Sequence, residues 1–140
     1  MEKLSDEDIH QIAKSLVYAG QLSTQVNQSS LDGQTEDLAR IQNIIDSDLI
    51  ESTKEDEIAC LGLAFGRVFV ENNQGFDWCI VNDEYGREVA IRFKDHNLLI
   101  FPQTMLLKRI EDGEDVDIQD LYFGLQAEID NILEEDCPNQ

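Results

Sequence analysis

Basic residues are scarce in this chain of 140 residues: 10 Lys and Arg accompany 30 Asp and Glu, so the formal net charge is −20. A protein of that sign is repelled by the phosphates of nucleic acids and by anionic lipid surfaces. Long apolar runs are also missing, since no uninterrupted run exceeds four residues, whereas a transmembrane helix needs about 20. We therefore expect neither a nucleic-acid partner nor a membrane partner.

Cysteine and histidine are few as well. Cys60, Cys79 and Cys137 form an odd set without a CxxC spacing, which is typical of free thiols in a reducing compartment rather than of a disulfide framework. His10 and His96 lie far apart in the sequence, so no metal-ligand spacing is present and we expect no metal or other cofactor. The first eight residues lack the basic segment and following apolar stretch of a secretory signal, and we expect a cytoplasmic protein.

Catalytic signatures are missing too. The chain contains neither of the glycine-rich phosphate-binding patterns, GxxxxGK[ST] or GxGxxG after a strand. His96 stands beside Asp95 in a predicted turn, and such a pair can act as an oriented base. No Ser or Cys accompanies it in a nucleophile context, however, and a turn needs only polar residues. The sequence therefore predicts a protein that is not an enzyme.

The acidic residues are distributed unevenly. Residues 1–57 hold 13 acidic and 4 basic residues, residues 58–110 hold six of each, and residues 111–140 hold 11 acidic residues and no basic one. The net charges of these segments are −9, zero and −11. A chain of this length is expected to fold as a single domain, residues 1–140, with a helical N-terminal part over residues 1–57.

Hydrophobic periodicity predicts an α+β fold with about three N-terminal helices. The first begins at Ser5, which forms a capping box with Asp8, and ends at Gly20; residues 21–34 are a loop or a frayed helix. Its apolar face comprises Ile9, Ile12, Ala13, Leu16 and Val17. A second helix covers residues 35–50, with Leu38, Ile41, Ile45 and Leu49 on its inner face and Ile44 beside them. A third covers residues 53–70, where Gly62 and Gly66 let another backbone approach closely.

A small antiparallel sheet of three to four strands follows, and then one amphipathic C-terminal helix. Strands are predicted at 76–81, 88–93 and 98–101, with turns at 82–86 and 94–97 and with Trp78 in the core. Residues 105–110 form either a fourth strand or a helical turn. Asp117 caps the last helix, whose apolar face comprises Ile118, Leu121, Tyr122, Leu125, Ile129, Ile132 and Leu133.

Two acidic segments are candidate partner-binding sites. The first lies before the last helix and consists of Glu111, Asp112, Glu114, Asp115 and Asp117. It does not match a calcium loop, because Gly113 follows Asp112 directly and the EF-hand register fails. The second is the turn Asp83, Glu84 and Tyr85, where an exposed tyrosine among acidic groups can anchor a contact. Excess charge also keeps a small protein soluble, but a segment of one sign favours rapid capture of a basic protein partner.

The middle of the chain resembles a bacterial domain family of unknown function. The residues that carry the resemblance are Leu61-Gly62-Leu63-Ala64-Phe65-Gly66, Trp78, Asp83-Glu84-Tyr85-Gly86, Pro102, Lys108-Arg109-Ile110-Glu111-Asp112-Gly113-Glu114 and Leu121. They match a pattern of an LGxxxG helix, a tryptophan strand, a DxxG turn, a proline after the last core strand and a KRIxxGE segment. The resemblance covers about residues 58–130, and these motif residues look structural rather than catalytic.

Small acidic proteins of this kind resemble immunity proteins, which are encoded beside antibacterial toxins of type VI or contact-dependent secretion. The resemblance implies a non-enzymatic protein, monomeric or dimeric, that binds and neutralises a cognate toxin with a basic cleft. Two alternatives remain open. An acidic chaperone of a secreted effector would form a stable dimer with an apolar groove, and a DNA mimic would carry carboxylates spaced like phosphates along an elongated surface.

Overall fold

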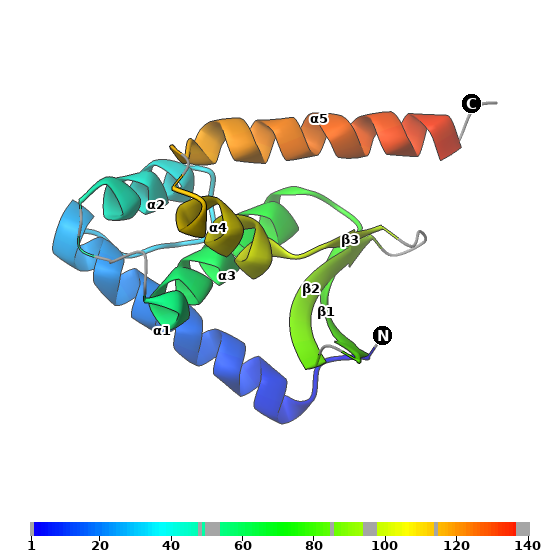
Figure 1. Ribbon diagram of the computed structural model, residues 1–140, viewed down its shortest axis with the longest axis horizontal. Coiled ribbons are helices and arrows are strands. Elements are labelled where there is room, and N and C mark those ends of the chain that lie inside the picture. The colour runs from blue at the N-terminus through cyan, green and yellow to red at the C-terminus, as the bar shows by residue number, and fades with distance from the viewer. Residues whose placement is uncertain are drawn as a thin grey trace.

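The elements of the chain follow the predicted α+β order (Figure 1). The computed structural model describes residues 2–47, 49, 54–84, 86–93, 98–113 and 115–136, and for residues 133–136 it describes the backbone alone. The elements are α1 (Asp6–Asn27), α2 (Glu36–Asp46), α3 (Glu55–Asn72), β1 (Phe76–Asp83), β2 (Gly86–Phe93), β3 (Leu99–Ile100), α4 (Pro102–Glu111) and α5 (Ile118–Asp136). In Figure 1, α3 crosses the middle of the molecule, α1 follows the lower edge, α5 follows the upper edge, and the sheet lies on the right.

Helix α1 begins as predicted but is longer than predicted. The Asp8 backbone N–H donates to Ser5 Oγ at 3.1 Å, and the Ser5 N–H donates to Asp8 Oδ2 at 2.9 Å, which completes the capping box. The helix does not end at Gly20, because that glycine is buried within it and packs against Ser30. It ends at Gln28, which adopts the left-handed conformation with φ 62°. Residues 21–34, predicted to be a loop or a frayed helix, are therefore helical up to Asn27.

The added length changes which face of α1 is buried. Ile12, Ala19 and Leu22 are buried, whereas Ile9 is 53% exposed and Val17 is 62% exposed. The prediction that Ile9 and Val17 belong to the inner face was wrong. The C-terminal half of the helix determines its orientation, because residues 19, 22 and 23 pack into the interior.

Helix α2 is shorter than predicted. It ends at Asp46 with Ser47 as its cap, so Leu49 lies beyond the helix and is 41% exposed instead of being on the inner face. Leu38, Ile41 and Ile44 are buried, while Ile45 is half-buried.

The loop before α2 is held by a buried carboxylate. Asp37 accepts hydrogen bonds from the backbone N–H of Gly33 at 2.7 Å and of Asp32 at 3.1 Å, and from Arg40 Nη1 at 2.8 Å. Burial of a charged group is unfavourable unless it is hydrogen-bonded. These three donors satisfy the carboxylate and fix the connection between α1 and α2.

The sheet is antiparallel in the order β1-β2-β3, which confirms three strands in the described part of the chain. Its register pairs Trp78 with Ile91 and Asp83 with Gly86, so the strands of the hairpin extend into the predicted turn at 82–86. Strand β3 is only two residues long.

Residues 105–110 are helical and belong to α4. This helix begins with Pro102, a residue whose lack of an N–H is tolerated in the first turn.

The close backbone approach predicted for the two glycines of α3 is confirmed at Gly62, whereas Gly66 is approached by side chains. A Cβ at Gly62 would lie 2.6 Å from the Gln103 Cα, and a Cβ at Gly66 would lie 2.9 Å from both Pro102 Cγ and the Trp78 ring. Residues of three elements therefore meet at one side of α3, and Trp78 is half-buried there, packed against the core.

The predicted face of α5 is confirmed where it is described, with Ile118, Tyr122 and Ile129 buried. The Leu133 side chain lies outside the described residues.

None of the helices in the described ranges combines the length and the apolar character that crossing a membrane requires.

Candidate acidic binding site

The two acidic segments predicted from the sequence lie at different places in the fold. Asp83 and Glu84 are at the end of the β1–β2 hairpin, beside the start of α1 (Figure 1). Glu111 ends α4 and Asp112 caps it, on the other side of the molecule. Tyr85 and Glu114 lie outside the described residues. The structure therefore does not unite these segments into one site.

The end of α4 instead meets the start of α3. The two helices run antiparallel, since Gly62 faces Gln103 and Glu111 reaches Glu55, the first residue of α3. Burial raises the pKa of the Glu111 carboxyl, and the neighbouring Glu55 and Asp112 carboxylates raise it further. Like charges are thus held together at this end of the helix pair.

Beside this contact is a hollow of about 570 Å³, which we call the acidic hollow. It is lined by Tyr18, Lys54, Glu55, Asp56, Glu57 and Cys60. The Tyr18 hydroxyl donates a hydrogen bond to Glu57 Oε2 at 3.0 Å, and burial together with this carboxylate raises the pKa of Tyr18. Because Tyr18 is still 38% exposed, its ring can contact a bound partner.

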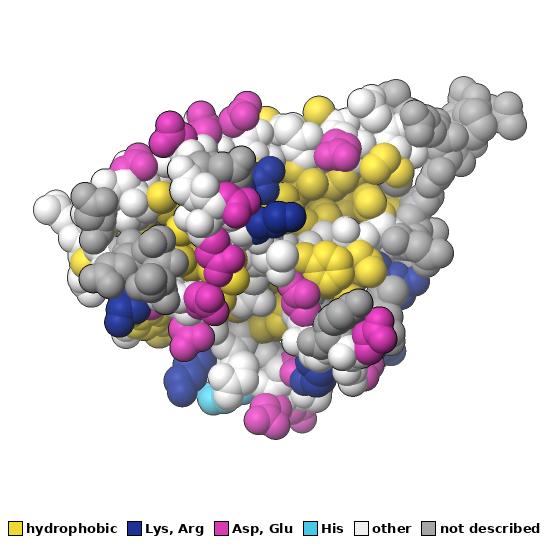
Figure 2. Space-filling model, in the orientation of Figure 1, with side chains coloured by type: hydrophobic (Ala, Val, Ile, Leu, Met, Phe, Trp, Pro, Cys, Tyr) yellow, Lys and Arg dark blue, Asp and Glu magenta, His cyan; other side chains and the backbone are white. Residues whose placement is uncertain are grey.

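The side chains of the acidic hollow suit the binding of a cation. Its described lining residues include three carboxylates and only one lysine. Cys60 is half-buried, and burial raises the pKa of its thiol, so it stays protonated and is a weak nucleophile at neutral pH. No group of three or more His, Cys, Asp or Glu within the described ranges has the arrangement of a metal site. Figure 2 shows acidic side chains following one another over the end of α4 and the start of α3.

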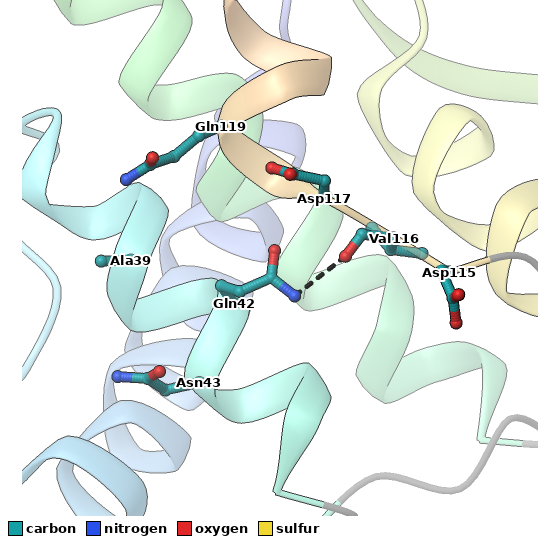
Figure 3. Close-up of a pocket in the computed structure, with 7 residues that line it drawn as sticks. All are labelled: Ala39, Gln42, Asn43, Asp115, Val116, Asp117 and Gln119. Carbon is teal, nitrogen blue, oxygen red and sulfur yellow. Dashed lines mark hydrogen bonds between the residues drawn. The ribbon is translucent and has the colours of Figure 1, made fainter.

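Asp115 and Asp117 belong to a second hollow, of about 450 Å³, between α2 and the segment before α5 (Figure 3). Gln42 fixes this segment, because its Nε2 donates to the Val116 carbonyl at 2.9 Å and its Oε1 accepts from the Ile118 N–H at 2.8 Å. Figure 3 shows the Asp115 and Asp117 side chains pointing in different directions. Asp117 Oδ1 accepts from the Asp120 N–H at 3.0 Å, which confirms the predicted helix cap.

Sequence reasoning missed the contribution of α3 and Tyr18 to this site. Glu55, Asp56 and Glu57 form the acidic first turn of α3, where their interaction with the helix dipole is favourable without any partner. Their proximity to Glu111 depends on α4 being a helix antiparallel to α3. Tyr18 lies on the exposed side of α1, and its pairing with Glu57 spans 39 residues; the periodicity of α1 carried no signal for it.

Comparison with known proteins bears on the fold and the family. No curated protein sequence matches the chain. A crystal structure of a protein from Bacteroides thetaiotaomicron VPI-5482 is similar, with a TM-score of 0.81, 22% identity, and coverage of 92% of this chain and 46% of that one. The chain thus spans less than half of that protein's length, and the likeness concerns the fold. The family model of DUF3806, a domain of unknown function, matches residues 37–122, which is more than half of the chain. This range overlaps the segment that resembles such a family in the sequence analysis. The chain belongs to the DUF3806 family.

Proposed function

We propose that the chain is a non-enzymatic immunity protein, which binds and neutralises a cognate antibacterial toxin of the type VI or contact-dependent kind. The binding surface is the acidic hollow together with Glu111 and Asp112. Its partner is a basic protein whose Lys or Arg side chains enter the hollow, with Tyr18 as the aromatic contact. The protein acts in the cytoplasm by blocking the toxin rather than by chemistry.

The observation that carries this proposal is the cluster of acidic side chains where the start of α3 meets the end of α4: Glu55, Asp56 and Glu57 line the acidic hollow, and Glu111 lies near Glu55. Neighbouring carboxylates repel each other, and partial desolvation together with the nearby Glu55 raises the pKa of Glu111. A cation from a partner would relieve the repulsion, so the arrangement favours the bound state over the free state. A strongly acidic surface also attracts a basic partner over a distance and speeds association.

Charge reversal combined with a growth assay tests the proposal. A candidate toxin, sought among the genes adjacent to this one, is expressed in bacteria with the wild-type chain, with Glu55→Lys/Glu111→Lys, or with the control Asp130→Lys on the exposed side of α5. We expect the wild type and the control to protect growth and the double variant to fail. Binding to the purified toxin should weaken strongly with added salt, and the double variant should mainly slow association.

Other outcomes point to other functions. Absence of protection by the wild type, with no binding to the toxin, would overturn the proposal. A stable dimer that binds an unfolded effector segment would favour the effector chaperone instead. Competition with DNA for a nucleic-acid-binding protein would favour the DNA mimic.

A further inference from the structure

A second, chemically different surface lies between β3, α4 and α5, and we call it the α5 groove. It has a volume of about 390 Å³ and is lined mainly by apolar side chains, including residues 98–101, Met105, Leu125 and Ile129. Figure 2 shows this hydrophobic surface open on the face below α5, with basic side chains beside it. The groove is thus unlike the acidic hollow in both polarity and charge.

The groove follows the edge of a strand. Successive side chains of a strand point to opposite faces, so Leu99 and Ile100, the two residues of β3, can both line one groove only when it runs along their backbone. The edge of β3 that faces β2 is paired: the Phe93 N–H donates to the Leu98 carbonyl at 3.2 Å, and Ile91 pairs with Ile100. By the alternation of an antiparallel ladder, the N–H and C=O of Leu99 point away from β2. Within the described part of the chain, β3 pairs with β2 alone.

An unpaired strand edge distinguishes between kinds of occupant. A lipid chain could cover the apolar side chains but would leave the Leu99 N–H and C=O without partners, which is unfavourable once they are buried. An extended peptide can cover the apolar side chains and also supply hydrogen-bond partners, because its own backbone can pair with Leu99 as an added strand. The edge therefore favours a peptide over a lipid.

Two cations determine the charge of that peptide. Lys108 and Arg109 line the groove together with one carboxylate, Glu128, so its described lining still carries one net positive charge. Neither cation forms an ion pair with another described residue, whereas Arg40, Arg67 and Arg87 each do. In a chain of net charge −20, such cations attract an anionic group. A free C-terminal carboxylate is usually captured by clustered backbone N–H groups, but the end of α4 presents carbonyls. The matching group is therefore an acidic side chain.

We propose that the α5 groove binds an extended apolar segment of a partner protein, which pairs with the backbone of Leu99 and directs an Asp or Glu side chain to Lys108 and Arg109. This proposal is independent of the proposed function, because it concerns a different surface and a peptide of opposite charge. It would hold whether or not the chain neutralises a toxin.

Selection from random octapeptides displayed on phage, followed by measurements on the best peptide, tests the proposal. We expect selected peptides to alternate apolar residues, to contain Asp or Glu, and to lack proline at the centre. The best peptide, synthesised with both ends blocked, should slow hydrogen exchange of the Leu99 amide and leave that of Ile100, already bonded to β2, unchanged. Lys108→Glu should weaken its binding about tenfold or more, and Lys108→Gln should weaken it less.

A matched control is Lys14→Glu on the exposed surface of α1, which changes the net charge equally. It should leave the affinity unchanged. The proposal is overturned by a selection without enrichment, by equal loss of affinity in both Glu variants, or by an unchanged Leu99 amide. Binding of decanoate but of no peptide would assign the groove to lipids. A dimer in solution that Lys108→Glu dissociates would assign it to a second copy of the chain.

Discussion

Asp8 and Arg87 form a two-point ion pair, in which Nη1 donates to Oδ1 and Nη2 donates to Oδ2, both at 3.1 Å. The pair joins the first turn of α1 to β2, 79 residues further along the chain. Close by, Glu2 and Ile80 exchange two backbone hydrogen bonds, of 2.7 and 2.9 Å. The N-terminal segment is thus attached to the hairpin by both backbone and side-chain contacts.

This ion pair predicts an acid-sensitive contribution to stability. Hydrogen bonds from Arg87 and from the Ser5 N–H lower the pKa of Asp8 from 3.8 to about 2. Because the folded state holds the proton less tightly than the unfolded state, the contribution is present above the ordinary pKa and is lost as the pH falls from 3.8 toward about 2. In Arg87→Gln we expect the Asp8 pKa to return toward its ordinary value and the melting temperature to fall clearly at pH 7 but much less at pH 2, where Asp8 of the wild type is already about half protonated.

NMR titration of the Asp8 carboxyl and thermal unfolding at several pH values measure these effects. The matched control is Arg67→Gln, which removes an exposed pair with Glu71 within one helix, and such pairs contribute little. An Asp8 carboxyl that titrates at its ordinary pKa in the wild type would contradict the prediction.

The contact between Gly62 and Gln103 predicts opposite effects of the same substitution at two helical glycines. In Gly62→Ala the new methyl group would lie 2.6 Å from the Gln103 Cα and 3.0 Å from the Pro102 carbonyl oxygen. Since backbone atoms cannot move aside easily, we expect a loss of about 1–3 kcal/mol of unfolding free energy. Gly124→Ala, where no atom lies within 4 Å of the added Cβ, should gain about 1 kcal/mol from helix propensity.

Denaturant unfolding of both variants measures the difference. Equal changes in the two variants would show that helix propensity, and not the approach of α4, determines the role of Gly62.

Much of the fold could be predicted, because patterns among residues close in sequence determine most of its helices and strands. The Ser5 capping box, the alternation around Ile91 and the apolar face of α5 each depend on residues close in sequence, and the structure confirms them. Gly20 misled the prediction, because a glycine can end a helix or allow close packing within one. Here Ser30 packs against it, and that contact involves residues ten positions apart.

The candidate site was less predictable, because its members come together only through tertiary packing. The acidic cluster at 111–117 was visible in the sequence, but Glu111 lies near the start of α3, whereas Asp115 and Asp117 line a hollow beside α2. The position of Asp115 and Asp117 depends on Gln42, which holds Val116 and Ile118 by hydrogen bonds. Gln42 is a polar residue in the middle of a helix, and the sequence does not indicate that it bonds this segment. Similarly, residues 105–110 fit either a strand or a helical turn by pattern, and only as a helix do they carry Glu111 to Glu55.

Gln42 predicts how the segment before α5 is held. Its amide both donates and accepts, so Gln42→Glu keeps the acceptor for the Ile118 N–H but loses the donor to the Val116 carbonyl. It also adds a carboxylate beside Asp115 and Asp117. We expect faster hydrogen exchange of the Ile118 amide and a loss of about 1–2 kcal/mol of unfolding free energy.

Gln119→Glu is the control, since it makes the same chemical change on an exposed side chain lining the same hollow. An equal effect in Gln119→Glu would mean that added negative charge, and not the lost hydrogen bond, weakens the segment.

The contact between Glu111 and Glu55 predicts a gain of stability when one charge is removed. The pKa of Glu111 lies above its ordinary 4.5, first because of burial and then because of Glu55. The folded state therefore holds this proton more tightly than the unfolded state, and stability is lost as the pH rises from 4.5 through the raised pKa. Glu111→Gln should raise the melting temperature at pH 7 and change it little below pH 4, and Glu55→Gln should lower the pKa of Glu111.

Asp130→Asn is the matched control, because it makes the same change in net charge on the exposed side of α5. It distinguishes the effect of removing the Glu111 charge near Glu55 from the effect of lowering the total charge. If both variants raised the melting temperature equally, the repulsion would belong to the whole acidic surface and not to the pair. If Glu111→Gln alone does so, a cationic partner in the acidic hollow should likewise lower the pKa of Glu111. NMR titration of this carboxyl with and without the proposed toxin partner then measures the coupling between proton release and binding directly.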